Sequence, residues 1–507
     1  KRFLTDPEGG FLNFNFVYYS SLTSYAGNDY SSPYPFIIKH TKGSWYDATQ
    51  HYREWALQQP WTSGGPLSTR SDVPAWFKDA PLMFYVSSAT VSATACATGA
   101  MNFKQYFGYQ GALPIIWYNW TLFRPAESSL SSLVAGTHEF NVFPSQQDFA
   151  TAVQTCANNG LYVQPYLNSR ISDVPNLQDT TFPAGWYANC IKNFWGAPQV
   201  WNSSYPGLID MCPTTSVFRN YLINTATTLA GNYNCAGAYL DQFGGLRSYC
   251  YDTSHNHELC GGVWQTTALD SLAQAVRTSV QNTNSNAVFF QEDGSDLFMN
   301  SIDANLMHVD LQPCRTPLLS AVYGGYWTSF GRAIHSSISN DTYFRMAISN
   351  MFVYGLKLGR FQVSGTDFLL TDPQYATRMA LLRTLATYKY SARAYLQYGR
   401  MIRPIKFASM SNVQYVFNSR TVTQPAIMSS VWEAPDGSVA VVLFNIGMSS
   451  MNFSFSMNST DYPILSNTVS RSQMMSDGTL TAIDTVSGTV SFSGTMAADE
   501  IRIYVLD

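Results

Sequence analysis

Charge is what this sequence most conspicuously lacks. Only 12% of its 507 residues are Asp, Glu, Lys or Arg, and 29 basic residues stand against 33 acidic ones. No cluster of basic residues could neutralise a run of phosphates, so nucleic acid is not expected as a partner. Apolar runs are short as well, and none reaches the roughly 18 residues that a membrane-spanning helix needs. We therefore expect a polar, weakly ionic protein without a transmembrane segment.

The residues that open the sequence, Lys1-Arg2-Phe3-Leu4, do not have the pattern expected of an apolar secretory leader. Such an opening is typical of a processed mature terminus, or of a fragment from which upstream strands are missing. An upstream fragment of the same precursor is therefore one expected partner. A Gly-x-Gly-x-x-Gly turn is absent too, which disfavours a doubly wound dinucleotide-binding sheet.

Sequons and cysteines indicate the compartment. Five N-x-Ser/Thr sequons favour a glycoprotein that is secreted or displayed at the cell surface, at Asn119, Asn202, Asn340, Asn452 and Asn458. Eight cysteines suggest disulfides in such a chain. We favour Cys250 with Cys260, since a short polar loop separates them. The same loop holds His255 and His257 and could bind zinc, but its spacing matches no strong Cys/His template, so no metal is expected.

The chain has three regions that differ in residue pattern. Residues 1–72 alternate aromatic with polar residues and then adopt helical spacing between Gly43 and Trp61, which predicts the end of an N-terminal β-domain and a linker helix. Residues 73–400 alternate short apolar strands with helical stretches, which predicts a (β/α)8 TIM barrel in the α/β class. Residues 401–507 return to strand-like runs separated by Ser, Gly and Asp, which predicts an antiparallel β-sandwich.

Eight strands and several long helices are expected within the barrel. The strands are placed at Leu82–Val86, Ile115–Trp120, Tyr162–Leu167, Ala238–Asp241, Val288–Glu292 and Leu306–Val309, with two weaker ones near Val322 and at Phe361–Val363. The clearest helices are Gln146–Asn158, Val217–Leu229, Thr266–Gln281, Asp341–Met351 and Pro373–Tyr398.

Two of these strands end in a carboxylate, Asp241 and Glu292, and a glycine follows each shortly afterwards. Because the C-terminal ends of barrel strands face one pocket, strands four and five should bring the two carboxyl groups together. Glycosidic cleavage needs two carboxyl groups in different roles, about 5–5.5 Å apart in a retaining enzyme. We expect Asp241 to be the nucleophile and Glu292 the acid/base, with Asp293 competing for the second role. Either acid could instead cap a helix or stabilise a loop.

Residue types that suit a sugar gather near the other strand ends. Aromatic faces can stack on a pyranose, while amide, imidazole and carboxylate groups bond its hydroxyls. The candidates for substrate binding are Trp117, Trp120, Tyr166, Asn168, Arg170, Gln242, His257, Asp293, His308 and Asp310. Aromatics near strands more often belong to the core. A glycan on Asn119 would also obstruct the pocket, unless the sequon is unused or the second strand ends earlier.

Four motifs carry a family resemblance: Gly43-Ser-Trp-Tyr-Asp-Ala-Thr-Gln-His-Tyr-Arg-Glu-Trp-Ala, Ile115-Ile-Trp-Tyr-Asn-Trp, Tyr239-Leu-Asp-Gln and the loop from His257 to Trp264. They resemble an uncharacterised family of TIM-barrel proteins in the glycoside hydrolase superfamily. More distantly, the chain is similar to endo-α-N-acetylgalactosaminidases and α-amylase-like enzymes. This resemblance implies a β-domain, a catalytic barrel and a C-terminal sandwich. It also implies an Asp nucleophile after strand four and a Glu acid/base after strand five, positions that Asp241 and Glu292 match.

The leading hypothesis is a secreted, retaining glycoside hydrolase that acts on an α-linked glycan without a cofactor. A first alternative is a glycosidase-like scaffold that serves as a carbohydrate-binding or structural glycoprotein of a surface or filament and self-assembles. Low charge, many aromatics and several sequons would suit that role. A second alternative is a zinc-dependent hydrolase that uses His255 and His257.

Overall fold

The structure is a computed structural model. It describes residues 2–5, 12–15, 37, 41–88, 91–120, 146–173, 185–202, 205–245, 247–307, 316–331, 334, 341–363, 372–417 and 420–507. The chain forms two compact units. The first contains residues 1–39, 170–222 and 246–272, and the second contains residues 40–169, 223–245 and 273–507. The domain boundaries predicted after residues 72 and 400 stay predictions.

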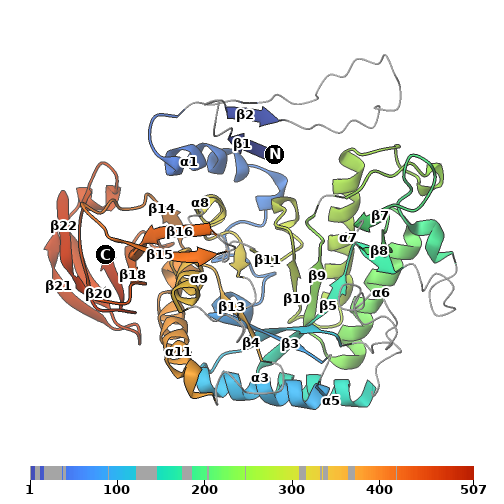
Figure 1. The fold of residues 1–507 in the computed structure, drawn as a ribbon, viewed down its shortest axis with the longest axis horizontal. Coiled ribbons are helices and arrows are strands. Elements are labelled where there is room, and N and C mark those ends of the chain that lie inside the picture. Colours follow the sequence, from blue (N-terminus) through green and yellow to red (C-terminus); the bar gives the residue numbers. More distant parts are fainter. Residues whose placement is uncertain are drawn as a thin grey trace. The chain divides into compact units, whose positions relative to one another are not determined.

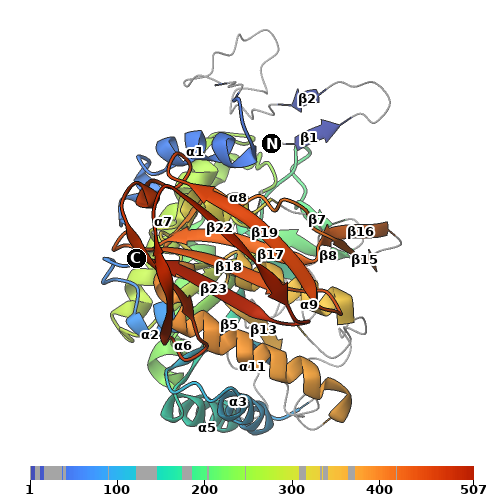
Figure 2. The same cartoon turned by 90° about the vertical axis from the view of Figure 1, so that its left-hand side faces the viewer.

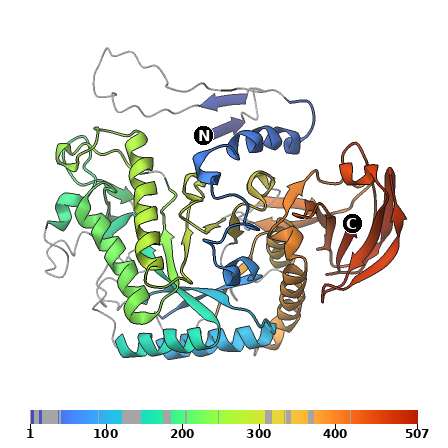
Figure 3. The same cartoon turned by 180° about the vertical axis from the view of Figure 1, so that it is seen from behind.

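A parallel eight-stranded barrel lies in the second unit (Figure 1, and from behind in Figure 3). Its strands, in chain order, are β3 (Leu82–Ser87), β4 (Leu113–Tyr118), β5 (Leu161–Asn168), β9 (Gly237–Asp241), β10 (Val288–Gln291), β11 (Ala304–Leu306), β12 (Thr328–Phe330) and β13 (Leu358–Gln362). Each strand pairs with its neighbour in the chain, and β13 pairs with β3. A parallel bridge from Phe330 to Lys357 joins the last two strands and closes the ring. This is the predicted TIM-barrel fold.

The barrel strands are apolar on both faces because helices cover the outside. All residues of β9 and β10 are buried, as expected for parallel strands. The side chains that face inward alternate along the strands and include Ile116, Tyr166, Tyr239 and Phe290, which pack in one cluster. Gly237 opens β9, and a Cβ there would lie 1.8 Å from the Val288 carbonyl oxygen, so only glycine permits this approach of β9 to β10.

The predicted helices are present. They are α5 (Gln146–Asn158), α6 (Ser216–Tyr233), α7 (Val263–Gln281), α9 (Asp341–Val353), and the successive helices α11 (Ala376–Ser391) and α12 (Arg393–Leu396). Helix α3 (Ala93–Phe107) is typical in its caps: the Ser92 hydroxyl accepts from the Ala95 N–H, and the helix ends at Gly108 in the left-handed conformation. None of the helices in the described part of the chain combines the length and apolar character that crossing a bilayer requires.

Three strand placements need correction. The predicted strand near Val322 is wrong, since Val322 belongs to helix α8 (Leu318–Tyr323), and the seventh strand is β12. The sixth strand lies at Ala304–Leu306, slightly before the predicted segment. A short apolar run satisfies a helix and a strand equally well, so pattern alone could not separate them. Strand β4 ends at Tyr118, two residues earlier than predicted.

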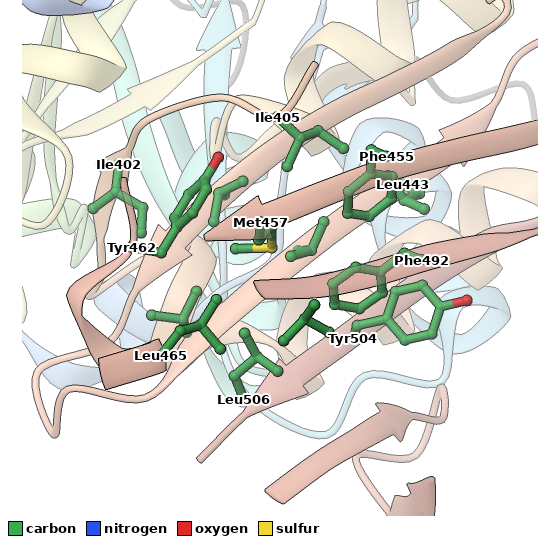
Figure 4. Close-up of a cluster of buried hydrophobic side chains, with 14 of the residues drawn as sticks. Ile402, Ile405, Leu443, Phe455, Met457, Tyr462, Leu465, Phe492, Tyr504 and Leu506 are labelled. Carbon is green, nitrogen blue, oxygen red and sulfur yellow. The ribbon is translucent and has the colours of Figure 1, made fainter. Parts of the chain in front are cut away.

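The C-terminal region forms antiparallel β-sheets, as predicted (Figure 2). One sheet has the order β14 (Arg400–Ile402), β17 (Ile427–Glu433), β18 (Val439–Asn445), β23 (Ile501–Leu506), β20 (Val469–Met474) and β21 (Leu480–Val486). A second layer pairs β19 (Met451–Asn458) with β22 (Thr489–Met496), and a separate hairpin pairs β15 (Asn412–Phe417) with β16 (Arg420–Pro425). The alternate residues Phe453, Phe455 and Met457 of β19 are buried in the shared core, and Figure 4 shows Phe455 and Met457 there. Phe455 stacks there on Phe492 with 4.7 Å between ring centroids.

The first unit contains small sheets. Strand β1 (Arg2–Thr5) pairs with β2 (Leu12–Asn15) in an antiparallel hairpin, which agrees with the predicted N-terminal β segment. A three-stranded sheet has the order β6 (Ile171–Asp173), β8 (Tyr205–Asp210) and β7 (Val200–Asn202). In the second unit, helix α1 (Trp45–Ala56) coincides with the predicted linker helix, and a capping box between Ser44 and Asp47 fixes its first turn.

Candidate active site

The C-terminal ends of β5, β9 and β10 bring four polar side chains to one end of the barrel. Asn168 of β5 lies opposite Asp241 of β9. Glu292 directly follows β10, and its N–H donates to the Leu240 carbonyl at 3.3 Å. Tyr166 and Asn168 lie two residues apart on β5, as do Tyr239 and Asp241 on β9. Side chains alternate along a strand, so residues two positions apart lie on the same face. The polar side chains at the strand ends therefore lie on the inward face of the barrel.

Asp241 is the centre of this group. Its side chain is buried, with 6% of the residue exposed. Its Oδ2 atom accepts a hydrogen bond from the Tyr166 hydroxyl at 2.6 Å and one from the Asn168 amide at 3.3 Å. The carboxyl group of Asp241 is also hydrogen-bonded to that of Glu292. The strand ends therefore place the two carboxyl groups in direct contact.

Burial, followed by the charge of Glu292, raises the pKa of Asp241 well above its usual range, and the Tyr166 hydrogen bond opposes this rise. Two carboxyl groups in contact cannot both ionise easily, so the pair retains one proton over a wide pH range. The donors on Asp241 favour the negative charge there. Glu292 is only half-buried, which leaves it open to solvent. The arrangement can thus supply one carboxylate and one carboxylic acid side by side.

Both carboxylates precede a sharp turn. Gln242 has φ 55° and Asp293 has φ 71°, both in the left-handed region that few residues other than glycine adopt. Such conformations are concentrated at functional sites. The Gly244 N–H donates to the Glu292 carbonyl at 3.0 Å, so the two turns are joined. Gln242 is buried and Asp293 is exposed. These turns end β9 and β10 immediately beside the two carboxyl groups.

Tyr166, a residue predicted from the sequence, belongs to an aromatic cluster whose other members were not predicted. Tyr118 lies 4.8 Å from Tyr166 and 6.1 Å from Tyr239, measured between ring centroids. Arg360 of β13 lies over the rings of Tyr85, Tyr118 and Tyr239 at 5.1–5.7 Å. Burial lowers the pKa of Arg360 to about 10. An arginine inside a short apolar strand was the available signal, because such a residue is seldom buried without a role.

The two predicted tryptophan platforms need correction. Trp117 and Trp120 are buried and pack on Phe149 of α5. The Trp120 indole N–H donates to the Tyr166 carbonyl at 2.8 Å. On β4 the inward positions are Ile116 and Tyr118, so Trp117 faces the covering helix instead. Both tryptophans belong to the core, because a strand apolar on both faces does not reveal which face is inside.

The remaining predicted residues lie in different places. Arg170, in the first unit, forms a two-pronged ion pair with Asp210 at 2.8 and 3.2 Å. His257, in the same unit, stacks on Trp264. His308 and Asp310 lie outside the described residues.

The sequons stay predictions. The Asn119 side chain donates to the Ser87 hydroxyl at 2.8 Å. Asn452 is exposed and Asn458 half-buried. The Asn202 side chain and all of Asn340 lie outside the described residues.

The predicted disulfide is not formed. Cys250 and Cys260 pair through their backbones as an antiparallel bridge, but both are free cysteines. The Cys250 thiol instead lies 3.4 Å from His255 Nδ1. A short loop can bring two backbones together without aiming their sulfur atoms at each other, which disulfide geometry requires.

Comparison with known proteins gives a family and two relatives. A family model described as "Domain of unknown function (DUF6259)" matches residues 30–335. "Putative glycoside hydrolase 22789" of Monosiga brevicollis is 25% identical over 464 residues, which cover 81% of this chain and 38% of that protein. A "Putative glycoside hydrolase" of Bacteroides thetaiotaomicron is 22% identical over 438 residues, which cover 84% of this chain and 60% of that protein. The chain thus spans less than two thirds of either relative.

Solved structures share the fold. A maltogenic α-amylase from Thermotoga neapolitana superimposes with a TM-score of 0.56 at 12% identity, over 85% of this chain and 99% of that one. An α-amylase from Geobacillus thermoleovorans gives 0.54 at 11% identity, over 85% and 99%. A GH36 α-galactosidase from Geobacillus stearothermophilus gives 0.54 at 9% identity, over 91% and 59%. At these identities the likeness establishes the barrel architecture.

Proposed function

Because the chain belongs to the DUF6259 family and aligns with two relatives named as glycoside hydrolases, we propose that it is a retaining glycoside hydrolase. Asp241 is the nucleophile and Glu292 the acid/base. The observation that carries this proposal is the hydrogen-bonded pair of carboxyl groups at the ends of adjacent barrel strands. An inverting enzyme needs room for a water between its two acids. The direct interaction of Asp241 with Glu292 supports a spacing nearer to the about 5–5.5 Å of a retaining enzyme than to the roughly 6.5–9.5 Å of an inverting one.

The reaction proceeds in two steps. In the first, an Asp241 oxygen attacks the anomeric carbon, the bond to the leaving oxygen breaks, and the proton of Glu292 passes to that oxygen. In the second, the Glu292 carboxylate takes a proton from water while the water oxygen attacks the same carbon, which releases Asp241 as a carboxylate. The sugar product keeps its anomeric configuration, and both carboxyl groups return to their starting states.

The hydrogen bonds of the site support this division of roles. Tyr166 and Asn168 both donate to Asp241, which stabilises its ionised form and makes it the nucleophile. Burial and Glu292 oppose that ionisation, so the pair shares one proton, and we assign it in the reacting complex to Glu292, the more exposed of the two acids, where a leaving group can receive it. The chemistry requires no cofactor. The preference for an α-linked glycan is the expectation from the family resemblance, and a secreted or cell-surface location is proposed on the five sequons.

The test begins with wild-type chain and a panel of aryl α- and β-glycosides and glycosyl fluorides. With the best substrate, we expect Asp241→Asn to abolish turnover. Glu292→Gln should lower kcat by about 10²–10⁴-fold on aryl glycosides with poor leaving groups, the usual contribution of an acid/base. Glycosyl fluorides need little protonation of the leaving group. With these substrates, Glu292→Gln should therefore reduce the rate of the first step much less than with aryl glycosides. NMR of the first product should show retained configuration.

Two further variants sharpen this test. Asp293→Asn decides the competing assignment, because only a true acid/base would show the leaving-group dependence. Asp477→Asn, an exposed carboxylate between β20 and β21, is the matched control and should behave as wild type. Turnover by Asp241→Asn at the wild-type rate would reject the nucleophile. A wild-type chain that binds sugars, self-associates in light scattering and cleaves nothing would favour the scaffold instead.

A further inference from the structure

A cluster of metal-binding side chains lies in the first unit. One potential ligand atom from each of Cys212, Cys250, His255 and His257 falls within 4.8 Å of all the others. All four residues belong to the same compact unit. Cys212 follows strand β8 by two residues, and the others come from the loop after β9. Folding therefore joins a short loop motif to a cysteine 38 positions earlier in the chain.

Both histidines present one nitrogen to the cluster and fix the other outside it. His255 Nδ1 lies 3.4 Å from the Cys250 sulfur, while its Nε2 lies 2.6 Å from the Ala188 carbonyl oxygen. His257 Nδ1 lies 2.8 Å from the Glu258 carbonyl oxygen. Metal-binding histidines almost always use their second nitrogen in this way, because the outer hydrogen bond sets the tautomer and the ring orientation.

The Nε2 atom of His257 is buried and has no hydrogen-bond partner of ordinary geometry among the described residues, and the His257 ring interacts with the Cys250 thiol. Leaving a polar atom buried without a partner costs about 1–3 kcal/mol. The ring itself is held rigidly, since it stacks on Trp264 at 3.7 Å with the two planes 3° apart. An ordered imidazole with a potential ligand atom within 4.8 Å of two sulfur atoms has the geometry expected of a metal ligand.

The surroundings of the cluster are mostly apolar, although Thr214 Oγ1 lies 3.1 Å from the Cys212 sulfur and Asp252 Oδ2 lies 3.5 Å from His255 Nε2. Cys212 and Cys250 are fully buried and pack with Ile191, and Trp264 covers them. His255 is 5% exposed. A shell of this kind excludes competing water from a metal and holds the ligands in place.

We propose that Cys212, Cys250, His255 and His257 bind zinc in a closed, structural site. Two sulfur and two nitrogen donors form one of the usual structural zinc sets. With Zn–S about 2.3 Å and Zn–N about 2.0–2.1 Å, a tetrahedral site separates its donors by roughly 3.3–3.8 Å. In the structure the four ligand atoms lie within 4.8 Å of one another, so they need to move together only slightly to reach these separations. Binding releases the two thiol protons to solvent, and the resulting site of two thiolates and two neutral imidazoles carries no net charge.

Such a zinc site would be structural rather than catalytic. Four protein ligands leave no open position for water or substrate, so the zinc-dependent hydrolase considered from the sequence is not what this set favours. The metal would tie the end of β8 to the loop that follows β9. Cys250 comes nine residues after Asp241 in the chain. The zinc proposal does not rest on the glycosidase proposal.

The test is metal analysis of the full chain, purified without chelators. We expect inductively coupled plasma mass spectrometry to find one zinc ion per chain. Exchange for Co²⁺ should produce the intense visible bands of tetrahedral cobalt and a near-ultraviolet thiolate-to-cobalt band. Cys212→Ala and His257→Ala should lower the affinity for Co²⁺ by more than the roughly 10–100-fold that loss of an outer hydrogen-bond partner costs. Cys190→Ala is the matched control: Cys190 is a buried, free cysteine of the same unit outside the set, and this variant should keep one equivalent.

Three results would overturn the proposal. The first is a wild-type chain that holds neither zinc nor cobalt stoichiometrically after dialysis against each metal. The second is a Cys212–Cys250 disulfide found by intact mass and thiol counting in the chain as purified. The third is undiminished metal binding by Cys212→Ala. If that variant does not fold, the cobalt spectrum of the wild type still decides. A chain that cleaves glycosides but binds neither zinc nor cobalt would reject the zinc site and leave the proposed function intact.

Discussion

Removal of one hydroxyl group from β5 tests the electrostatics of the carboxyl pair. Tyr166→Phe deletes the 2.6 Å hydrogen bond to Asp241 and changes little else in the packing of the ring. A hydrogen bond to the charged form of an acid lowers its pKa, so its loss raises the pKa of Asp241. In the proposed mechanism Asp241 must be ionised to attack the anomeric carbon. The acidic limb of the pH–rate profile should therefore move to higher pH.

The size of the shift follows from the geometry. A hydrogen bond to a charged group contributes about 1.5–3 kcal/mol, and about 1.4 kcal/mol corresponds to one pKa unit. Loss of the Tyr166 bond alone would thus raise the pKa of Asp241 by about 1–2 units. The Asn168 amide remains 3.3 Å from the same oxygen and takes over part of the stabilisation. We expect a shift of about 1 unit, which means a roughly tenfold lower kcat/KM at pH values below the wild-type limb.

The assay is kcat/KM against pH for the best aryl glycoside, because this profile reports the pKa values of the free enzyme. Tyr239→Phe is the matched control. Its hydroxyl is buried one strand away and has no hydrogen-bond partner among the described residues, so its loss should leave the limb in place. An apparent pKa of the acidic limb in Tyr166→Phe that lies within about 0.3 units of the wild-type value would refute the reasoning, because 0.3 units is only a twofold difference in the ionised fraction. So would a limb that moved to lower pH.

Two further predictions concern stability and are measured by urea unfolding. Asp303 is fully buried and accepts two hydrogen bonds from Arg277 at 2.8 and 2.9 Å, so Asp303→Ala should lower the free energy of unfolding by about 3–5 kcal/mol. Asp484→Ala, which breaks a half-exposed ion pair of the sandwich, should cost at most about 1 kcal/mol. Equal losses in the two variants would contradict this. Burial lowers the pKa of Lys357 to about 7, whereas the unfolded value is about 10.4. Between these values the unfolded chain binds the extra proton, so stability should rise with pH by up to about 1.4 kcal/mol per unit. Lys357→Met should remove that part of the slope, and an unchanged slope would exclude Lys357 as its source.

The barrel and the location of its acids could be predicted from local pattern. Short apolar strands that alternate with helices indicate a parallel sheet, and this pattern can be recognised without knowing which distant segments contact each other. The chain order of the strands then places Asp241 after the fourth and Glu292 after the fifth. Adjacent parallel strands must present their C-terminal ends together, so the proximity of the two carboxyl groups followed from connectivity alone.

Other features depended on which way a side chain faces. Trp117 and Tyr118 are neighbours on β4, yet one packs on helix α5 and the other joins the interior cluster. A strand that is buried on both sides has no polar face to mark the outside, so its sequence is compatible with either orientation. For the same reason the Tyr166 hydroxyl could not be assigned to Asp241 before the register of β5 and β9 was known.

The sequence by itself determined the fold class, the order of the strands and the two carboxylates at their ends, because each depends on local periodicity and chain order. Only the tertiary structure decided the inner and outer faces of the barrel, the burial of Arg360 among tyrosines, and the meeting of Cys212 with the loop that carries His255 and His257. These depend on contacts between segments far apart in the chain. Their spacing is set by how the whole polypeptide packs, and no local pattern records it.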